Sequence, residues 1–107
     1  DKYEKQVSSE IKTDELTYPL NNYIALADEL HDAMAYLGTK DSKIKAIFMK
    51  MNTLSDVLQL IKAFGSRNYY PFWGSKTLPQ WLYAELTTGE IAEINAIMKQ
   101  KSINFSF

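Results

Sequence analysis

The sequence predicts an all-α fold, a compact bundle of five short helices with an extended N-terminal arm and a short C-terminal tail. Apolar residues recur at three- and four-residue spacing in five successive segments, which is the pattern of amphipathic helices. Threonines and glycines separate these segments, as helix N-caps and helix stops do. No convincing β-hairpin or βαβ pattern competes with this interpretation.

Residues 1–20 are polar and weakly periodic, and Pro19 stands near their end. We expect them to form a linker or an arm laid over the domain of residues 21–107, with a helical turn around residues 11–16. The first helix follows from Asn21 and ends at Gly38, because glycine commonly follows a helix C-terminus. Its apolar stripe consists of Ala27, Leu30, Met34 and Leu37.

Threonines are the expected N-caps of the other four helices, because the Thr hydroxyl can accept a hydrogen bond from a free backbone N–H. These residues are Thr39, Thr53, Thr77 and Thr87. An acidic or amide residue stands three positions after each of the last three, as in a capping box. The third helix is expected to stop at Gly65. The final residues alternate apolar and polar, which predicts an extended tail with Ile103, Phe105 and Phe107 packed inward.

Composition excludes several classes of protein. The 107 residues fit one domain. Lys and Arg number 12 against 13 Asp and Glu, so no basic field attracts nucleic acid and we do not expect that partner. The absence of cysteine excludes disulfides, thiolate nucleophiles and Cys-ligated zinc. No stretch approaches the roughly 18 apolar residues of a membrane span. The chain begins at Asp1 rather than Met, so we expect a processed or partial product.

Catalytic patterns are also missing from the sequence. The single histidine, His31, lies between Asp28 and Asp32 and is expected to be a surface residue near carboxylates. The four glycines are isolated, so there is no phosphate-binding loop. We therefore predict that the protein is not an enzyme.

The corner between the first two helices, residues 33–41, is one candidate site. The carbonyl oxygens at a helix C-terminus lack intrahelical partners and are hard ligands suited to calcium, which a distant carboxylate would complete. The alternative, which we favour, is an ordinary corner between helices with a glycine stop and a threonine start.

The connection of residues 65–76 is the second candidate, because four aromatic residues occupy five positions between two basic residues, Arg67 and Lys76. The predicted contact surface consists of Arg67, Tyr69, Tyr70, Phe72 and Trp73. Such a group suits a partner protein, a membrane interface or a nucleic-acid stacking platform. With equal weight, the aromatic rings cap the small core instead. We predict that Trp73 is partly buried beside Trp81 and that Tyr69 and Tyr70 point outward.

Three segments resemble an annexin repeat, a five-helix unit. Residues 33–39 (Ala-Met-Ala-Tyr-Leu-Gly-Thr), followed by an acid-bearing turn and an Ile-rich helix, resemble its junction between the first two helices. Residues 84–98 resemble its junction between the last two helices and the final helix. Residues 64–67 (Phe-Gly-Ser-Arg) resemble the end of its third helix. The resemblance covers residues 22–100, with the helices in the same order.

The resemblance implies a calcium site. Annexins bind the ion through carbonyls of the first junction and one carboxylate of the second, which match the carbonyls of Met34, Tyr36 and Gly38 and the side chain of Glu85. Tyr36 stands where the family has a glycine, and its restricted backbone makes an open carbonyl loop harder to form. Lys40 adds a positive charge beside the loop. We therefore expect weak or absent calcium affinity.

Two functions remain at this stage. We expect a non-catalytic, annexin-like binding or structural module in a larger assembly, which contacts a protein partner or a second copy through the aromatic connection. Single divergent annexin-like units also occur in bacterial and bacteriophage proteins. The alternative is a calcium-dependent domain that binds a phospholipid membrane surface.

Overall fold

A computed structural model describes residues 10–35, 38–70 and 73–107. The predicted all-α fold is confirmed, since five α-helices dominate the described chain. They are α2 (Leu20–Ala35), α3 (Asp41–Met49), α4 (Leu54–Phe64), α5 (Leu78–Glu85) and α6 (Thr88–Gln100). A short 3-10 helix, η1 (Thr13–Glu15), precedes them, and two short strands, β1 (Ser66–Asn68) and β2 (Ser75–Thr77), lie between α4 and α5.

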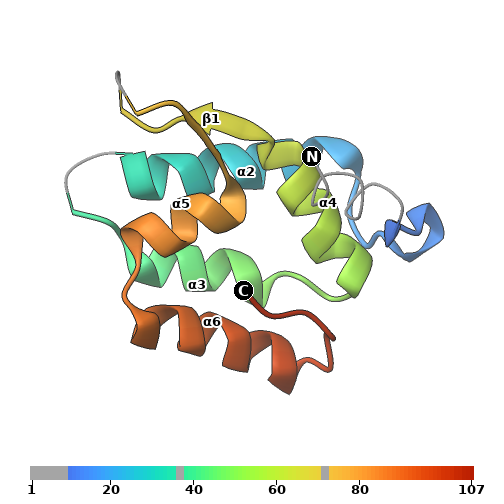
Figure 1. The fold of residues 1–107 in the computed structure, drawn as a ribbon. Coiled ribbons are helices and arrows are strands. Elements are labelled where there is room, and N and C mark those ends of the chain that lie inside the picture. The colour runs from blue at the N-terminus through green and yellow to red at the C-terminus, as the bar shows by residue number, and fades with distance from the viewer. Residues whose placement is uncertain (1–9, 36–37, 71–72) are drawn as a thin grey trace.

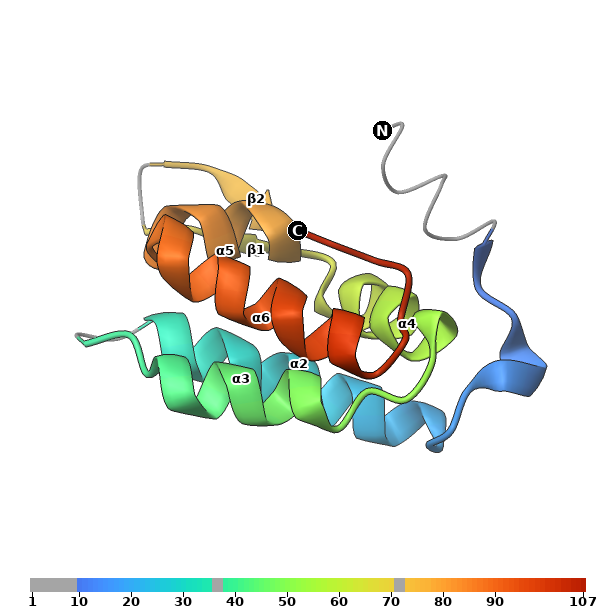
Figure 2. The same ribbon diagram turned by 90° about the horizontal axis from the view of Figure 1, so that it is seen from below.

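The helices surround one hydrophobic core. Figures 1 and 2 show α2, α3, α5 and α6 side by side, with α4 crossing one end of the group. α2 packs along α3 and α4, and α3 packs along α6. Each helix turns its apolar face inward, because burying apolar surface is the main favourable term in folding. The largest fully buried side chains include Trp81, Tyr23, Phe48, Leu30, Met34 and Ile44.

Three of the four predicted threonine N-caps are confirmed. The Thr53 hydroxyl accepts the backbone N–H of Asp56 at 3.0 Å. Thr87 and Glu90 form a reciprocal capping box at 3.1 and 2.9 Å. At the start of α5, the N–H of Thr77 donates to the side chain of Gln80 at 2.8 Å. These local contacts fix where each helix begins.

The predicted N-cap at Thr39 is wrong. α3 begins at Asp41, and Lys40 occupies the N-cap position without a side-chain capping hydrogen bond. The N–H of Lys40 donates instead to the carbonyl of Ala33 in α2 at 3.0 Å, and its own carbonyl accepts the N–H groups of Lys43 and Ile44. This contact between the two helices, rather than the threonine hydroxyl, sets the start of α3.

The expectation that no hairpin is present is also wrong. β1 and β2 form an antiparallel pair, with Arg67 opposite Lys76. Each strand has three residues, Ser-Arg-Asn and Ser-Lys-Thr, which are polar and lack the β-branched alternation that predicts strands. The pair forms because tertiary contacts hold it against the helices, which a local pattern does not reveal.

A buried carboxylate attaches the N-terminal segment to the bundle. Asp56 in α4 is completely buried and accepts hydrogen bonds from the backbone N–H of Thr17 (2.9 Å), the Thr17 hydroxyl (2.5 Å), the hydroxyl of Tyr23 in α2 and the N–H of Asn52 (2.9 Å). The backbone N–H of Lys12 also donates to the hydroxyl of Ser55 at 2.9 Å. The predicted turn within residues 11–16 is confirmed as η1.

The hydrogen bonds around Asp56 decide its charge state. Burial alone would raise the pKa of Asp56, but hydrogen bonds from Thr17, Tyr23 and Asn52 favour the carboxylate and lower the pKa overall. The carboxylate therefore stays ionised at neutral pH. Its contribution to stability is lost only when the pH falls below the ordinary aspartate range.

The C-terminal tail packs its apolar side onto α3 and α6, as predicted. Ile103 is buried, and the ring of Phe107 lies edge-on to Phe48 with centroids 5.3 Å apart. The side-chain amide of Asn95 in α6 donates to the carbonyl of Phe107 (3.0 Å) and accepts its N–H (2.8 Å). The tail thus closes one side of the core. Among the described residues, none of the helices combines the length and apolar character needed to cross a membrane.

Replacing Asp56 tests the importance of the buried carboxylate. We expect Asp56→Ala to lower the free energy of unfolding by about 3 kcal/mol, because several buried donors would lose their acceptor. Urea denaturation followed by circular dichroism measures the effect. The control Asp32→Ala, at a side chain that is 66% exposed, should stay within about 0.5 kcal/mol. Equal losses in the two variants would contradict the role given to Asp56.

Stability should also depend on pH through Tyr23. Burial, and then the hydrogen bond to Asp56, raise the pKa of Tyr23 to about 12. A tyrosine in the unfolded chain has a pKa of about 10, so the unfolded state releases this proton first and native stability falls as the pH rises from about 10 through 12. In urea denaturation across that pH range, the free energy of unfolding should decline less steeply for Tyr23→Phe than for wild type. Tyr83→Phe, at an exposed position, should leave the slope unchanged.

Candidate functional site

The candidate site is the aromatic hairpin, which we define as residues 66–77. Beyond the paired strands, the N–H of Tyr69 donates to the carbonyl of Gly74 at 2.7 Å, and the Ser75 hydroxyl donates to the side chain of Asn68 at 3.0 Å. Gly74 has a φ of +72° and Tyr70 a φ of +63°. A left-handed tyrosine is uncommon and needs surrounding contacts to hold it. Figure 2 shows both strands beside α5.

The contact between Tyr69 and Trp81 attaches the hairpin to the core. Trp81 in α5 is 1% exposed, and the Tyr69 ring meets it edge-on with centroids 4.8 Å apart. The Trp81 indole N–H donates to the carbonyl of Arg67 in β1 at 3.3 Å. The same indole packs edge-on to Phe64 of α4 and His31 of α2. The hairpin is therefore positioned by an aromatic ring of α5 that packs against rings of α2 and α4.

Arg67 forms a second attachment. Its Nε donates to the carbonyl of Phe64 at 3.0 Å, and its guanidinium lies 4.7 Å from the centroid of the Phe64 ring. Its Nη1 is 3.0 Å from Oδ1 of Asp28 in α2. The predicted contact residue Arg67 is thus occupied by contacts within the protein.

The predicted placement of Trp73 and Tyr69 is wrong. Trp73 is 66% exposed, whereas Tyr69 is partly buried and takes the place beside Trp81. Tyr70, 41% exposed, faces outward as predicted. Phe72 lies outside the described residues. Tyr69 extends the strand pair, because its N–H donates to the carbonyl of Gly74, and its ring reaches Trp81 from there. Trp73 lies in the turn, where its N–H is 3.4 Å from the carbonyl of Tyr70.

The exposed rings of the hairpin form a group beside a carboxylate. Ring centroids are 4.5 Å apart for Tyr69 and Tyr70 and 5.2 Å apart for Tyr70 and Trp73, both edge-on. The Tyr70 hydroxyl donates to Oε1 of Glu85, at the end of α5, at 3.1 Å. This hydrogen bond to a carboxylate raises the pKa of Tyr70. Burial, followed by the charge of Glu85, raises the pKa of Tyr69. Both tyrosines therefore stay neutral at neutral pH, and the Tyr70 hydroxyl keeps the proton that it donates to Glu85.

Of the four residues expected to bind calcium, the three that the structure describes have different surroundings. Met34 is fully buried in α2, and Gly38 is exposed with a φ of +79°. Tyr36 lies outside the described residues. Glu85 is hydrogen-bonded to the hairpin. In the ranges that the structure describes, no three His, Cys, Asp or Glu side chains are grouped to hold a metal ion. Whether calcium binds through the corner stays a prediction.

His31 is more engaged than the sequence indicates. Its Nδ1 is 3.4 Å from Oδ1 of Asp32, in line with the predicted carboxylate neighbour. Its ring also meets Trp81 edge-on, with centroids 5.2 Å apart, and its side chain is 27% exposed. The residue therefore helps to cover the core under the hairpin.

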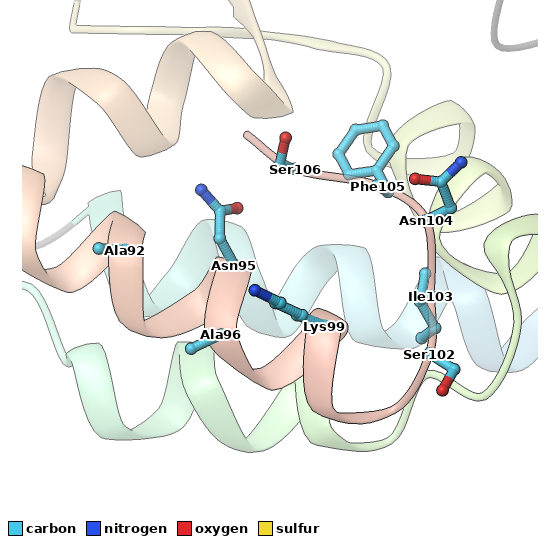
Figure 3. Close-up of a pocket in the computed structure, with 9 residues that line it drawn as sticks. All are labelled: Ala92, Asn95, Ala96, Lys99, Ser102, Ile103, Asn104, Phe105 and Ser106. Carbon is cyan, nitrogen blue, oxygen red and sulfur yellow. The ribbon is translucent and has the colours of Figure 1, made fainter.

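An open groove that the sequence analysis did not identify lies between α6 and the C-terminal tail, with a volume of about 800 Å³ (Figure 3). It is lined by Ala92, Asn95, Ala96, Lys99, Ser102, Ile103, Asn104, Phe105 and Ser106. The amide of Asn95 is paired with the backbone of Phe107, and Lys99 is the one ionisable side chain among these lining residues. This set offers no acid–base pair for catalysis.

Comparison with family models, curated proteins and solved structures found no match to this chain. The resemblance to an annexin repeat therefore stays a prediction.

The hairpin predicts unequal effects of two aromatic substitutions. We expect Tyr69→Ala to lower the free energy of unfolding by about 2 kcal/mol, because it removes a partly buried ring from Trp81. Trp73→Ala should change it by no more than about 0.5 kcal/mol, as exposed substitutions usually do. Urea denaturation of both variants measures the difference. A larger loss for Trp73→Ala would show that Trp73, and not Tyr69, supports the fold.

Proposed function

We propose that the protein is a non-catalytic binding module that contacts a partner protein through the hairpin tip, by which we mean the exposed side chains of Tyr70 and Trp73. The observation that carries the proposal is the exposure of Trp73 (66%) and Tyr70 (41%) on a hairpin whose base is attached to the core. Tryptophan and tyrosine dominate the binding energy of many protein interfaces.

The attachment of the hairpin supports a role in binding. Tyr69 on Trp81, Arg67 on Asp28 and Tyr70 on Glu85 restrain the hairpin before any partner arrives. A restrained surface loses little conformational entropy on association, so more of the contact energy appears as affinity. The left-handed backbone at Tyr70 is a further local strain of the kind found at binding sites.

The other exposed apolar side chains give a weaker argument. Leu20 and Ile24 in α2, Met49 in α3 and Tyr83 in α5 are each more than half exposed. Leu20 and Ile24 lie one turn apart on α2, and Met49 and Tyr83 lie on two other helices; exposed apolar groups of this size are normal on protein surfaces. The hairpin differs from them because its exposed rings contact one another.

The ionisable groups with described partners support the non-catalytic part of the proposal. Asp56 is enclosed by its four donors, and Lys45 of α3 pairs with Asp41 and with Glu93 of α6. The contacts of Asp56 and the pair of Lys45 with Glu93 connect different elements, and the pair with Asp41 lies within α3, so these groups have structural roles. A calcium-dependent membrane domain, as the annexin resemblance implies, is the competing proposal, since exposed tryptophan also suits a membrane interface.

Site-specific crosslinking tests the proposed surface. A photoreactive phenylalanine analogue at position 73 should crosslink one partner protein in cells that express this chain naturally, and the same analogue at position 83 should not. With the purified partner, Trp73→Ala should weaken binding by about 30-fold, the size of an interface hot spot. Tyr83→Ala, which removes a comparably exposed ring, should stay within about twofold.

Two outcomes would reject the proposal. One is unchanged partner affinity in Trp73→Ala. The other is calcium-dependent binding of wild type to vesicles of phosphatidylcholine and phosphatidylserine that is lost in Glu85→Gln, which would favour the membrane domain.

A further inference from the structure

The two basic residues that flank the aromatic positions in the sequence are both engaged by neighbouring groups. Arg67 forms an ion pair with Asp28, and the Lys76 ammonium lies 5.1 Å from the centroid of the Tyr69 ring. The aromatic hairpin is therefore not the aromatic and basic surface that its sequence indicates.

A carboxylate also borders the exposed rings. Glu85 accepts the Tyr70 hydroxyl at 3.1 Å, and in the described part of the chain no cationic side chain forms an ion pair with it. The Tyr70 ring in turn contacts Trp73. Glu85 therefore provides a carboxylate beside the group of rings to which Trp73 belongs.

Aromatic faces beside a carboxylate form the usual environment for a bound cation. The negative face of an aromatic ring attracts ammonium and guanidinium groups, and tryptophan does so most strongly. Lys76 above Tyr69 shows that this group of rings already holds one cation from its own chain. Trp73 offers further exposed ring surface to a cation from outside.

We propose that the hairpin tip recognises an arginine side chain of the partner protein, with Trp73 supplying the aromatic surface and Glu85 the counter-charge. The inference rests on the proposed function and names the chemistry of the partner. Arginine suits the tip better than lysine, because its planar guanidinium both stacks on aromatic rings and donates in pairs to carboxylates.

A short peptide tests the chemistry without knowledge of the partner. The acetylated and amidated tripeptide Gly-Arg-Gly is titrated into the full chain, and the indole N–H signal of Trp73 is followed by NMR. We expect a saturable shift with a dissociation constant of about 1 mM, the scale for one side chain on an exposed site. The same peptide with citrulline, a neutral analogue of arginine, should give no saturable shift at equal ionic strength.

Three variants separate the roles of the charges. Glu85→Gln, which keeps an acceptor for Tyr70, should weaken binding of the arginine peptide about threefold. Lys76→Gln should strengthen binding of the arginine peptide, because it removes a cation that competes for the aromatic rings. The control Glu29→Gln makes the same charge change at an exposed position of α2 that lines a hollow between α2 and α3 together with Lys40 and Lys43, and it should leave binding unchanged.

The outcomes distinguish this inference from the proposed function. Equal shifts with the citrulline peptide, or unchanged affinity in Glu85→Gln, would overturn the arginine site even if Trp73→Ala still abolished partner binding. Loss of the Trp73 signal on phosphatidylcholine vesicles, with no shift from the arginine peptide, would overturn it in favour of a lipid headgroup.

Discussion

The packing of Trp81 is the interaction on which the rest of the candidate site depends. Its indole is almost completely buried and meets rings from α2, α4 and the hairpin, while its N–H bonds to the backbone of Arg67. A side chain with so many neighbours has little freedom to move, because protein interiors are densely packed. Trp81 thereby fixes α2, α4 and α5 relative to β1. These contacts explain why two strands of three residues each are stable without a larger sheet.

Asp56 performs a comparable role at the other end of α4. A buried carboxylate is costly unless it is hydrogen-bonded, and its donors come from the N-terminal segment, from α2 and from the residues just before α4. Because Asp56 needs these donors, the polar N-terminal segment that contains Thr17 is attached to the bundle. Hydrogen bonds to Asp56 thus hold the N-terminal segment against α2 and α4, although the segment itself buries little apolar surface.

The arrangement of charges around the hairpin changes how its composition is interpreted. In sequence, two basic residues flank four aromatic ones, a combination that suits a partner protein, a membrane interface or a nucleic-acid stacking platform. In the fold, Arg67 is neutralised by Asp28, Lys76 covers Tyr69, and the carboxylate beside the exposed rings comes from Glu85 at the end of α5. The proposed partner chemistry follows from these contacts between elements that are separate in sequence. The proposed binding surface stands on a hairpin that is attached to the core, and such preorganisation favours affinity.

The sequence by itself determined the five helices and where three of them begin. Apolar spacing and N-caps such as Thr53 and Thr87 act within a few residues, so a local pattern contains the information. The hairpin, the start of α3 and the exposure of Trp73 were decided only by the tertiary structure. Polar strands have no apolar period to detect, and Lys40 and Tyr69 are placed by contacts with α2 and α5. Which aromatic ring is buried depends on which one can reach Trp81, and that distance exists only after the helices have packed.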